Sequence, residues 1–127
     1  MTDKITVLVI DDEIVSRATI EALLESDNHT LVFAENGKQG LEKIDLMTPD
    51  LVLLDVMMPG MNGFEVCRRL RANPHLANLP VVMVTAWHDP TARSRCLEIG
   101  ATEVIGKPFN RANLNTVVNK LTQSQQK

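Results

Sequence analysis

The stretch PDLVLLDVMMPGMNGFE, from Pro49 to Glu65, indicates how the whole chain folds. Its Leu51–Leu54 run is continuously apolar, as is typical of a strand buried on both faces of a parallel sheet. An acid, Asp55, follows the run directly, and a proline and two glycines then form a tight turn. Asn62 stands where it would cap a following helix. The stretch therefore predicts a buried strand, a turn and a helix, with a carboxylate at the end of the strand.

Apolar runs of this kind alternate along the chain with segments of helical periodicity. In the last segment, apolar residues recur at i, i+3, i+4 and i+7 from Leu114 to Leu121. The alternation predicts helices on both faces of a parallel sheet, joined by right-handed crossovers. The expected buried strands are Ile5–Ile10, Leu31–Ala34, Leu51–Leu54 and Val81–Val84, with a weaker strand at Glu103–Gly106. The expected helices are Ile14–Glu25, Gly37–Met47, Asn62–Ala72, about Pro90–Ile99 and the segment around Leu114–Leu121.

A chain of 127 residues is long enough for one domain with its own hydrophobic core. We assign residues 1–122 to that domain and 123–127 to a polar tail or the start of a linker. With 44% apolar and 23% charged residues, the composition fits a soluble globular protein. No apolar run approaches the roughly 18 residues of a membrane span, and the N-terminus lacks the pattern of a signal peptide. We therefore expect a cytoplasmic protein without a membrane partner.

Charge and cysteine content argue against two further kinds of site. The net charge is −3, and the 13 Lys and Arg residues are scattered, so direct nucleic acid binding is not expected. Cys67 and Cys96 form no CxxC pair, and each falls in a helical segment. We expect both to be buried, reduced thiols rather than a disulfide or a zinc site.

Polar residues stand where the predicted strands end. Asp11 and Asp12 follow the first strand, Asp55 follows the third, Thr85 closes the fourth and Lys107 follows the fifth. In an open parallel sheet, ligands bind in the crevice beyond the carboxyl ends of the strands. All five groups should therefore lie along the same edge of the sheet.

The chemistry of these groups points to phosphoryl transfer with a bound cation. Three neighbouring carboxylates repel one another and need a cation, and oxygen ligands without His or Cys select a hard ion such as Mg²⁺. One carboxylate can then act as a nucleophile toward phosphorus, while Lys107 and Thr85 stabilise the phosphoryl oxygens. Each residue alone has an ordinary explanation, such as a helix cap for Asp12. Five polar residues together at the same ends of the strands favour a functional site.

Five stretches of the chain together form a recognisable pattern. They are VLVIDDE (Val7–Glu13), AENGKQGLE (Ala34–Glu42), PDLVLLDVMMPGMNGFE (Pro49–Glu65), PVVMVTA (Pro80–Ala86) and GKPF (Gly106–Phe109). These stretches resemble the receiver domains of bacterial two-component response regulators, and the resemblance covers nearly the whole chain. It implies an α/β fold: a doubly wound five-stranded parallel sheet in strand order 2-1-3-4-5, with five helices in a flavodoxin-like three-layer sandwich.

The resemblance implies a role for each acid. Asp55 matches the phospho-acceptor, which would become an aspartyl phosphate. Asp12 matches a direct metal ligand, and Asp11 matches an acid that helps to hold the metal through water. The backbone carbonyl of Met57 would be a further ligand. The implied ion is Mg²⁺, with Mn²⁺ as an alternative.

The resemblance also implies how the signal is received and transmitted. The Thr85 hydroxyl would move onto the phosphoryl group, Lys107 would pair with it, and the Lys107-Pro108 peptide bond would be cis. The phosphoryl donor would be a histidine kinase or a histidine phosphotransfer protein, and the switch would control a partner or a downstream output domain. Such a domain is no enzyme in the usual sense, because it catalyses only its own phosphorylation and slow dephosphorylation. Homodimerisation on phosphorylation is left open.

Three positions depart from the family pattern. Val104 stands where the family often has Tyr or Phe, so we expect the output to rely on a shift of the segment from Ala86 through the fourth helix. Met57 and Trp87 are bulky at positions that influence how water reaches the acyl phosphate. They predict a phosphorylated form that hydrolyses slowly. For Trp87, an ordinary surface aromatic is an equal alternative.

Three other functions fit the sequence less well. A phosphatase of the haloacid-dehalogenase type would need a second acid two residues after the nucleophile, where Met57 stands. A flavin binder of the same fold would need a phosphate-cradling loop where Asp11 and Asp12 would repel phosphate. A receiver-like module that only binds partners would not need the complete set of five polar residues.

Overall fold

Five parallel strands form one sheet in the order β2-β1-β3-β4-β5 in the computed structural model, which describes residues 4–24, 28–86 and 90–123. The predicted fold class, strand order and number of α-helices are confirmed. The strands are β1 (Ile5–Ile10), β2 (His29–Ala34), β3 (Leu51–Asp55), β4 (Val81–Thr85) and β5 (Glu103–Gly106). The helices are α1 (Ile14–Leu24), α2 (Gly37–Met47), α3 (Gly63–Ala72), α4 (Pro90–Ile99) and α5 (Arg111–Gln123), with a short 3₁₀ helix at Pro74–Leu76.

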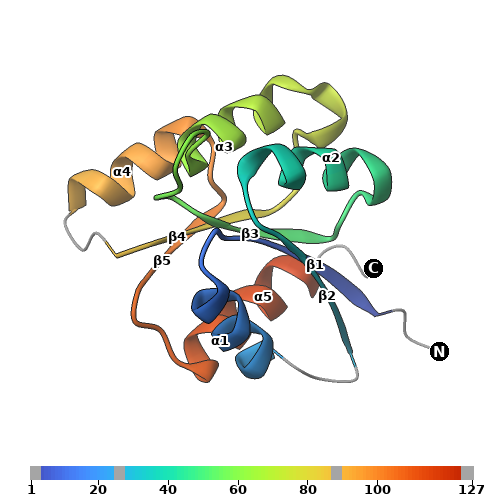
Figure 1. Ribbon diagram of the computed structural model, residues 1–127, viewed down its shortest axis with the longest axis vertical. Coiled ribbons are helices and arrows are strands. Elements are labelled where there is room, and N and C mark those ends of the chain that lie inside the picture. The colour runs from blue at the N-terminus through green and yellow to red at the C-terminus, as the bar shows by residue number, and fades with distance from the viewer. Residues whose placement is uncertain (1–3, 25–27, 87–89, 124–127) are drawn as a thin grey trace.

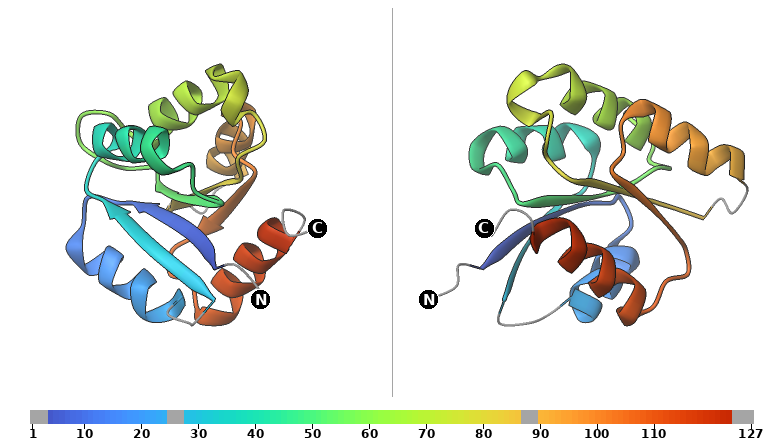
Figure 2. Two further views of the ribbon diagram at one scale, coloured as in Figure 1. Left: turned by 90° about the vertical axis from the view of Figure 1, so that its right-hand side faces the viewer. Right: turned by 180° about the vertical axis from the view of Figure 1, so that it is seen from behind.

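The sheet is the middle layer of three. Helices α1 and α5 cover one face, and α2, α3 and α4 cover the other (Figures 1 and 2). Two hydrophobic clusters fill the spaces between the layers: one includes Ile44 of α2 and Leu70 of α3, the other Ile20 of α1 and Leu114 of α5. Side chains of the central strands alternate between the two clusters, so those strands are apolar at almost every position.

Both cysteines lie in the cluster under α2, α3 and α4. Cys67 of α3 and Cys96 of α4 are buried and free, which confirms the prediction made from their spacing. Burial raises the pKa of each thiol, so both are in the protonated form at neutral pH.

The second strand differs from its prediction. It begins at His29 rather than Leu31, and of its six residues only Ala34 is buried. The reason is its position, because β2 is an edge strand and packs against fewer neighbours than β1 or β3. At the other end of the chain, α5 runs to Gln123, one residue past the predicted boundary at 122.

The predicted end of α1 at Glu25 lies outside the described residues. Asn62 precedes α3 as its cap, as the sequence predicts, and its Oδ1 accepts a hydrogen bond from the Glu65 N–H at 3.1 Å. No helix within the described ranges is long and apolar enough to cross a lipid bilayer.

Close packing of α2 on the sheet depends on a glycine. A Cβ atom on Gly40 would lie 2.4 Å from Cδ1 and 2.8 Å from Cγ1 of Ile10, a fully buried residue at the end of β1. Any larger side chain at this position would push α2 away from the strand that leads into the acidic loop. Gly40 therefore helps to set the position of α2 relative to β1.

We predict that Gly40→Ala lowers the free energy of unfolding by about 1–3 kcal/mol, the usual cost of overpacking. Ile10→Val removes the clashing Cδ1 atom and should cost about 0.5–1.5 kcal/mol by itself. Urea denaturation of the two single variants and the double variant would measure the coupling between them. The double variant should be less destabilised than the sum of the single variants. Simple additivity would show that Ile10 does not limit the approach of α2.

Candidate functional site

Strand register brings the polar residues of the sequence to one edge of the sheet. Ile10 pairs with Leu54, so Asp11 and Asp55 come at the same level of neighbouring strands. Asp55 pairs with Val84, and Thr85 pairs with Gly106, so Lys107 follows at the end of the last strand. The Lys107 N–H donates to the Thr85 carbonyl at 2.8 Å, which joins these two ends directly.

The three acids form a compact cluster. One carboxylate oxygen from each of Asp11, Asp12 and Asp55 lies within 4.8 Å of the others. Asp11 and Asp55 are only 2% and 5% exposed, so solvent does little to separate their charges. The predicted convergence of these acids is thus present in the structure.

Asp12 carries the clearest sign that the cluster suits a cation. Its Oδ1 atom is buried and has no hydrogen-bond partner, the one such side-chain atom within the described part of the chain. An unsatisfied buried carboxylate oxygen is costly unless a cation or donor meets it. Three carboxylates without His or Cys make an oxygen donor set that fits a hard divalent ion such as Mg²⁺.

A lysine partly balances the acids. The Lys107 Nζ atom lies 3.5 Å from Asp55 Oδ1 and 3.8 Å from Asp11 Oδ2. The Lys107-Pro108 peptide bond is cis, as the resemblance implied. Thr85, 2% exposed, ends β4 beside this lysine.

Burial dominates the electrostatics of Asp55. Desolvation, and then the nearby charge of Asp11, raise the pKa of Asp55 from 3.8 to about 6, while Lys107 acts in the opposite direction. Burial also raises the pKa of Asp11, although the Glu13 N–H donates to Asp11 Oδ1 at 2.9 Å and opposes the shift. Without a cation, the ionised cluster therefore destabilises the fold around it.

The turn after Asp55 folds back on the end of β3. A Cβ atom on Gly63 would lie 2.4 Å from the Asp55 carbonyl oxygen, so only glycine allows this close approach. The Gly63 N–H donates to the Val56 carbonyl at 2.9 Å, and Gly60 has a φ of 75°. The turn leaves the Met57 side chain 56% exposed beside the acids.

Comparison with known families gives a direct match to these features. A model described as "Response regulator receiver domain" matches residues 7–119. The chain belongs to this family. It is a receiver domain of two-component response regulators, which are signalling proteins.

Curated relatives carry the same kind of domain. Response regulator PleD of Caulobacter vibrioides is 38% identical over 117 residues, which are 92% of this chain and 26% of PleD. The phosphate regulon protein PhoB of Pseudomonas aeruginosa is 38% identical over 109 residues, 86% of this chain and 48% of PhoB. The two-component response regulator ORR3 of Oryza sativa is 33% identical over 116 residues, 91% of this chain and 88% of ORR3. The receiver domain described here thus spans about a quarter of PleD and about half of PhoB.

PhoB is a transcriptional regulatory protein. The prediction that nucleic acid is not a partner therefore finds no support in the comparisons.

Solved structures agree with the fold. Chemotaxis protein CheY4 of Vibrio cholerae has a TM-score of 0.86 and 28% identity, with 93% of this chain and 98% of CheY4 covered. The receiver domain of the sensor histidine kinase PA1611 from Pseudomonas aeruginosa also has a TM-score of 0.86, with 26% identity and 94% and 98% of the two chains covered. That structure contains a magnesium ion coordinated in its active-site cleft.

Of the positions that depart from the family pattern, Val104 is described by the structure and Trp87 is not. Val104 of this receiver domain is buried in β5 and contributes to the cluster under α2, α3 and α4, with no aromatic ring at its position. Trp87 lies outside the described residues.

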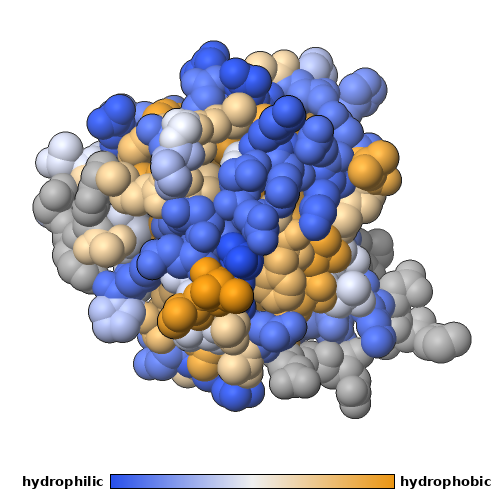
Figure 3. Space-filling view, viewed as in Figure 1, coloured by the Kyte–Doolittle hydropathy of each residue, from blue (hydrophilic) through white to orange (hydrophobic). Residues whose placement is uncertain are grey.

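The structure also reveals an apolar surface that the sequence reasoning missed. Ile14 and Val15, at the start of α1, are 72% and 73% exposed. In the space-filling view, apolar surface lies over the place that α1 occupies in Figure 1, bordered by hydrophilic side chains (Figure 3). A groove of about 330 Å³ beside it is lined in part by Val15, Lys107 and Phe109. The sequence contains a sign of this surface, because two adjacent apolar residues at the start of a helix cannot both face the sheet.

We predict that Asp55→Asn stabilises the metal-free receiver domain. A folded-state pKa of about 6 against an ordinary 3.8 corresponds to about 3 kcal/mol. The folded state holds the proton more tightly, so Asp55 makes the domain less stable as pH rises from about 4 to 6, and the loss is complete above that range. Asn carries no such charge. Urea denaturation in EDTA should therefore show a gain of up to about 3 kcal/mol at pH 7.5, and little difference at pH 3.

Asp45→Asn serves as the matched control, because Asp45 is an exposed acid of α2 outside the cluster. A gain for Asp55→Asn no larger than that for Asp45→Asn would contradict the assigned pKa.

Proposed function

We propose that this receiver domain accepts a phosphoryl group on Asp55 and then changes conformation to control a partner or an output domain. The donor is a phosphohistidine of a histidine kinase or of a phosphotransfer protein. One observation carries the proposal: the buried Asp55 carboxylate lies among two further carboxylates and 3.5 Å from the Lys107 ammonium. We assign this function to the domain that ends with α5, which runs to Gln123.

The proposed step is a displacement at phosphorus. A carboxylate oxygen of Asp55 forms a bond to phosphorus, and the bond from phosphorus to the donor imidazole nitrogen breaks with its electron pair going to that nitrogen. The Lys107 ammonium stabilises negative charge on the phosphoryl oxygens, and the Thr85 hydroxyl donates to one of them. The positions of these groups at neighbouring strand ends make the site a preorganised one.

Asp11, Asp12, Asp55 and the Met57 carbonyl are the groups that would hold Mg²⁺, with Mn²⁺ as an alternative. When bound, the ion would neutralise the carboxylates and the charge that develops on the phosphoryl oxygens. Two observations support this assignment: the unpaired Oδ1 atom of Asp12, and the magnesium ion in the related PA1611 receiver domain.

The same site argues against turnover of other phosphate esters. An enzyme that hydrolyses them through an aspartyl phosphate needs a general acid or base near the nucleophile. Two residues after Asp55 stands Met57, whose thioether cannot move a proton. The domain therefore catalyses only its own phosphorylation and its own slow dephosphorylation.

The apolar surface on α1 supports a protein as the phosphoryl donor. The side chains of Ile14 and Val15 are exposed. These residues follow Asp12 by two and three positions in the sequence, so they lie beside the acids. Exposed apolar side chains beside a reactive group are typical of a surface that another protein covers.

Incubation with acetyl phosphate and Mg²⁺ tests the acceptor. Mass spectrometry should show the gain of one phosphoryl group in the unmodified chain and in Asp45→Asn, and no gain in Asp55→Ala. EDTA should prevent the gain, because the carboxylates would then repel the phosphoryl oxygens. A gain that persists in Asp55→Ala would overturn the assignment of this acceptor.

We further predict that the phosphorylated form is long-lived. Met57 and Trp87 are bulky and largely apolar, and would leave attacking water poorly positioned. Met57→Asn and Trp87→Glu should each shorten the half-life by about three- to tenfold, a change of about 1 kcal/mol in the activation free energy. The decay of the phosphorylated protein after removal of the donor measures this directly. Half-lives unchanged in both variants would show that neither side chain limits the attack of water.

A further inference from the structure

Helix α4 is held on the sheet by little apolar burial. Of its ten residues only Ala92 and Cys96 are buried, and Ile99 is partly buried. Helix α3 has the same length and buries five residues. Burial of apolar surface stabilises packing in proportion to its area, so polar contacts carry a larger share of the attachment of α4.

Arg93 of α4 forms hydrogen bonds to β5 through both terminal nitrogens of its side chain. The Arg93 Nη2 atom lies 3.1 Å from Glu103 Oε1, and Arg93 Nη1 donates to the Val104 carbonyl at 3.3 Å. The two contacts hold the planar guanidinium in one orientation against the strand. A second arginine of α4, Arg95, has its Cζ atom 4.6 Å from the centre of the Phe64 ring on α3.

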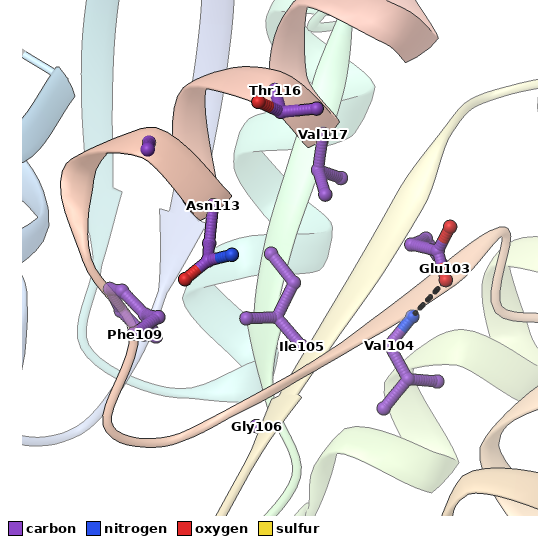
Figure 4. A pocket seen from close by; sticks show the side chains of 9 residues that line it. Glu103, Val104, Ile105, Gly106, Phe109, Asn113, Thr116 and Val117 are labelled. Atoms are coloured by element: carbon purple, nitrogen blue, oxygen red, sulfur yellow. Dashed lines mark hydrogen bonds between the residues drawn. The ribbon is translucent and has the colours of Figure 1, made fainter.

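The Glu103 carboxylate also contacts other groups besides Arg93. Its Oε1 also accepts a hydrogen bond from the Val104 N–H at 3.2 Å, and its Oε2 lies 3.6 Å from Lys120 Nζ of α5. Figure 4 shows Glu103 bonded to the Val104 N–H on β5, with α5 forming the opposite wall of a groove. The carboxylate is 21% exposed, so it is less screened by water than an ion pair at an open surface.

Along the chain, the residues that form these contacts lie between Thr85 and Lys107, two residues of the candidate phosphoryl site, except for Lys120. The chain leaves the site at Thr85, the last residue of β4, and enters α4 at Pro90. It returns to the site at Lys107, three residues after Val104. If Thr85 moves toward a phosphoryl group, the start of α4 is displaced, and the contacts of Arg93 with β5 resist that displacement.

We propose that Arg93, bonded to Glu103 and to the Val104 carbonyl, is a latch that holds α4 in its resting position and disfavours the phosphorylated form. This inference rests on the proposed function. A contact present only in the resting form weakens binding of a phosphoryl group by the same factor by which it favours that form. Loss of the latch therefore strengthens that binding.

Calorimetric titration of the full chain with beryllofluoride, a stable mimic of the phosphoryl group, in the presence of Mg²⁺ tests the latch. Arg93→Gln and Glu103→Gln should each lower the apparent Kd by about two- to fivefold, the change that exposed or partly exposed ion pairs produce in an equilibrium constant. The double variant should show no larger change than Arg93→Gln alone, because Arg93→Gln already removes the contact with Glu103.

Two control variants isolate the contact. Glu98→Gln changes an exposed charge of α4, and Lys120→Gln removes the contact of Glu103 with α5 while Arg93 keeps its own. Neither should change the apparent Kd. Hydrogen exchange without beryllofluoride should become faster in residues 90–99 of Arg93→Gln and stay the same in α3.

The outcomes separate the latch from the proposed function. Equal or weaker binding in Arg93→Gln, or an equal gain in Lys120→Gln, overturns the latch and leaves Asp55 as the acceptor. If the unmodified chain binds beryllofluoride no better than Asp55→Asn does, the proposed function fails and the latch fails with it.

Discussion

Close approach of three carboxylates at one edge of the sheet is the constraint on which the rest of the structure depends. Asp11 and Asp55 are nearly inaccessible to water, and one oxygen of Asp12 is buried without a partner. Ionised groups in such surroundings disfavour the folded state unless opposite charge compensates them. Lys107 supplies part of that charge, and the geometry suits a divalent cation for the remainder. The fold thus keeps the proposed phosphoryl acceptor and its countercharge together at the expense of local stability.

A parallel sheet is well suited to impose this constraint. The strands β1, β3, β4 and β5 are joined by hydrogen bonds in fixed register, so their ends cannot separate without breaking the ladder. Helices packed on both faces keep water from the strands themselves. By contrast, only Ala92 and Cys96 of α4 are buried, and both side chains are small. The polar groups of the candidate site therefore lie at the ends of hydrogen-bonded strands, and α4, with its small buried side chains, is the next helix after Thr85.

The attachment of α4 to the sheet bears on the proposed switch. An equilibrium between two arrangements responds to phosphorylation only as far as the phosphoryl group interacts better with one of them. Polar contacts such as those of Arg93 each contribute little free energy, so under the proposed function they would adjust this equilibrium without preventing the change. The side chain of Val104 is aliphatic and buried, but its backbone N–H and carbonyl both take part in these contacts.

The sequence by itself determined the alternation of strands and helices, the five polar residues at the strand ends and the cap at Asn62. These features are readable because apolar periodicity and the residues that end an element act over short stretches of chain. Only the tertiary structure decided that β2 is an open edge, that Ile14 and Val15 face solvent and that Oδ1 of Asp12 has no partner. It also decided the contact of Arg93 with Glu103 and of Glu103 with Lys120. Such features arise where segments distant in sequence pack together, and local periodicity does not encode which segments become neighbours.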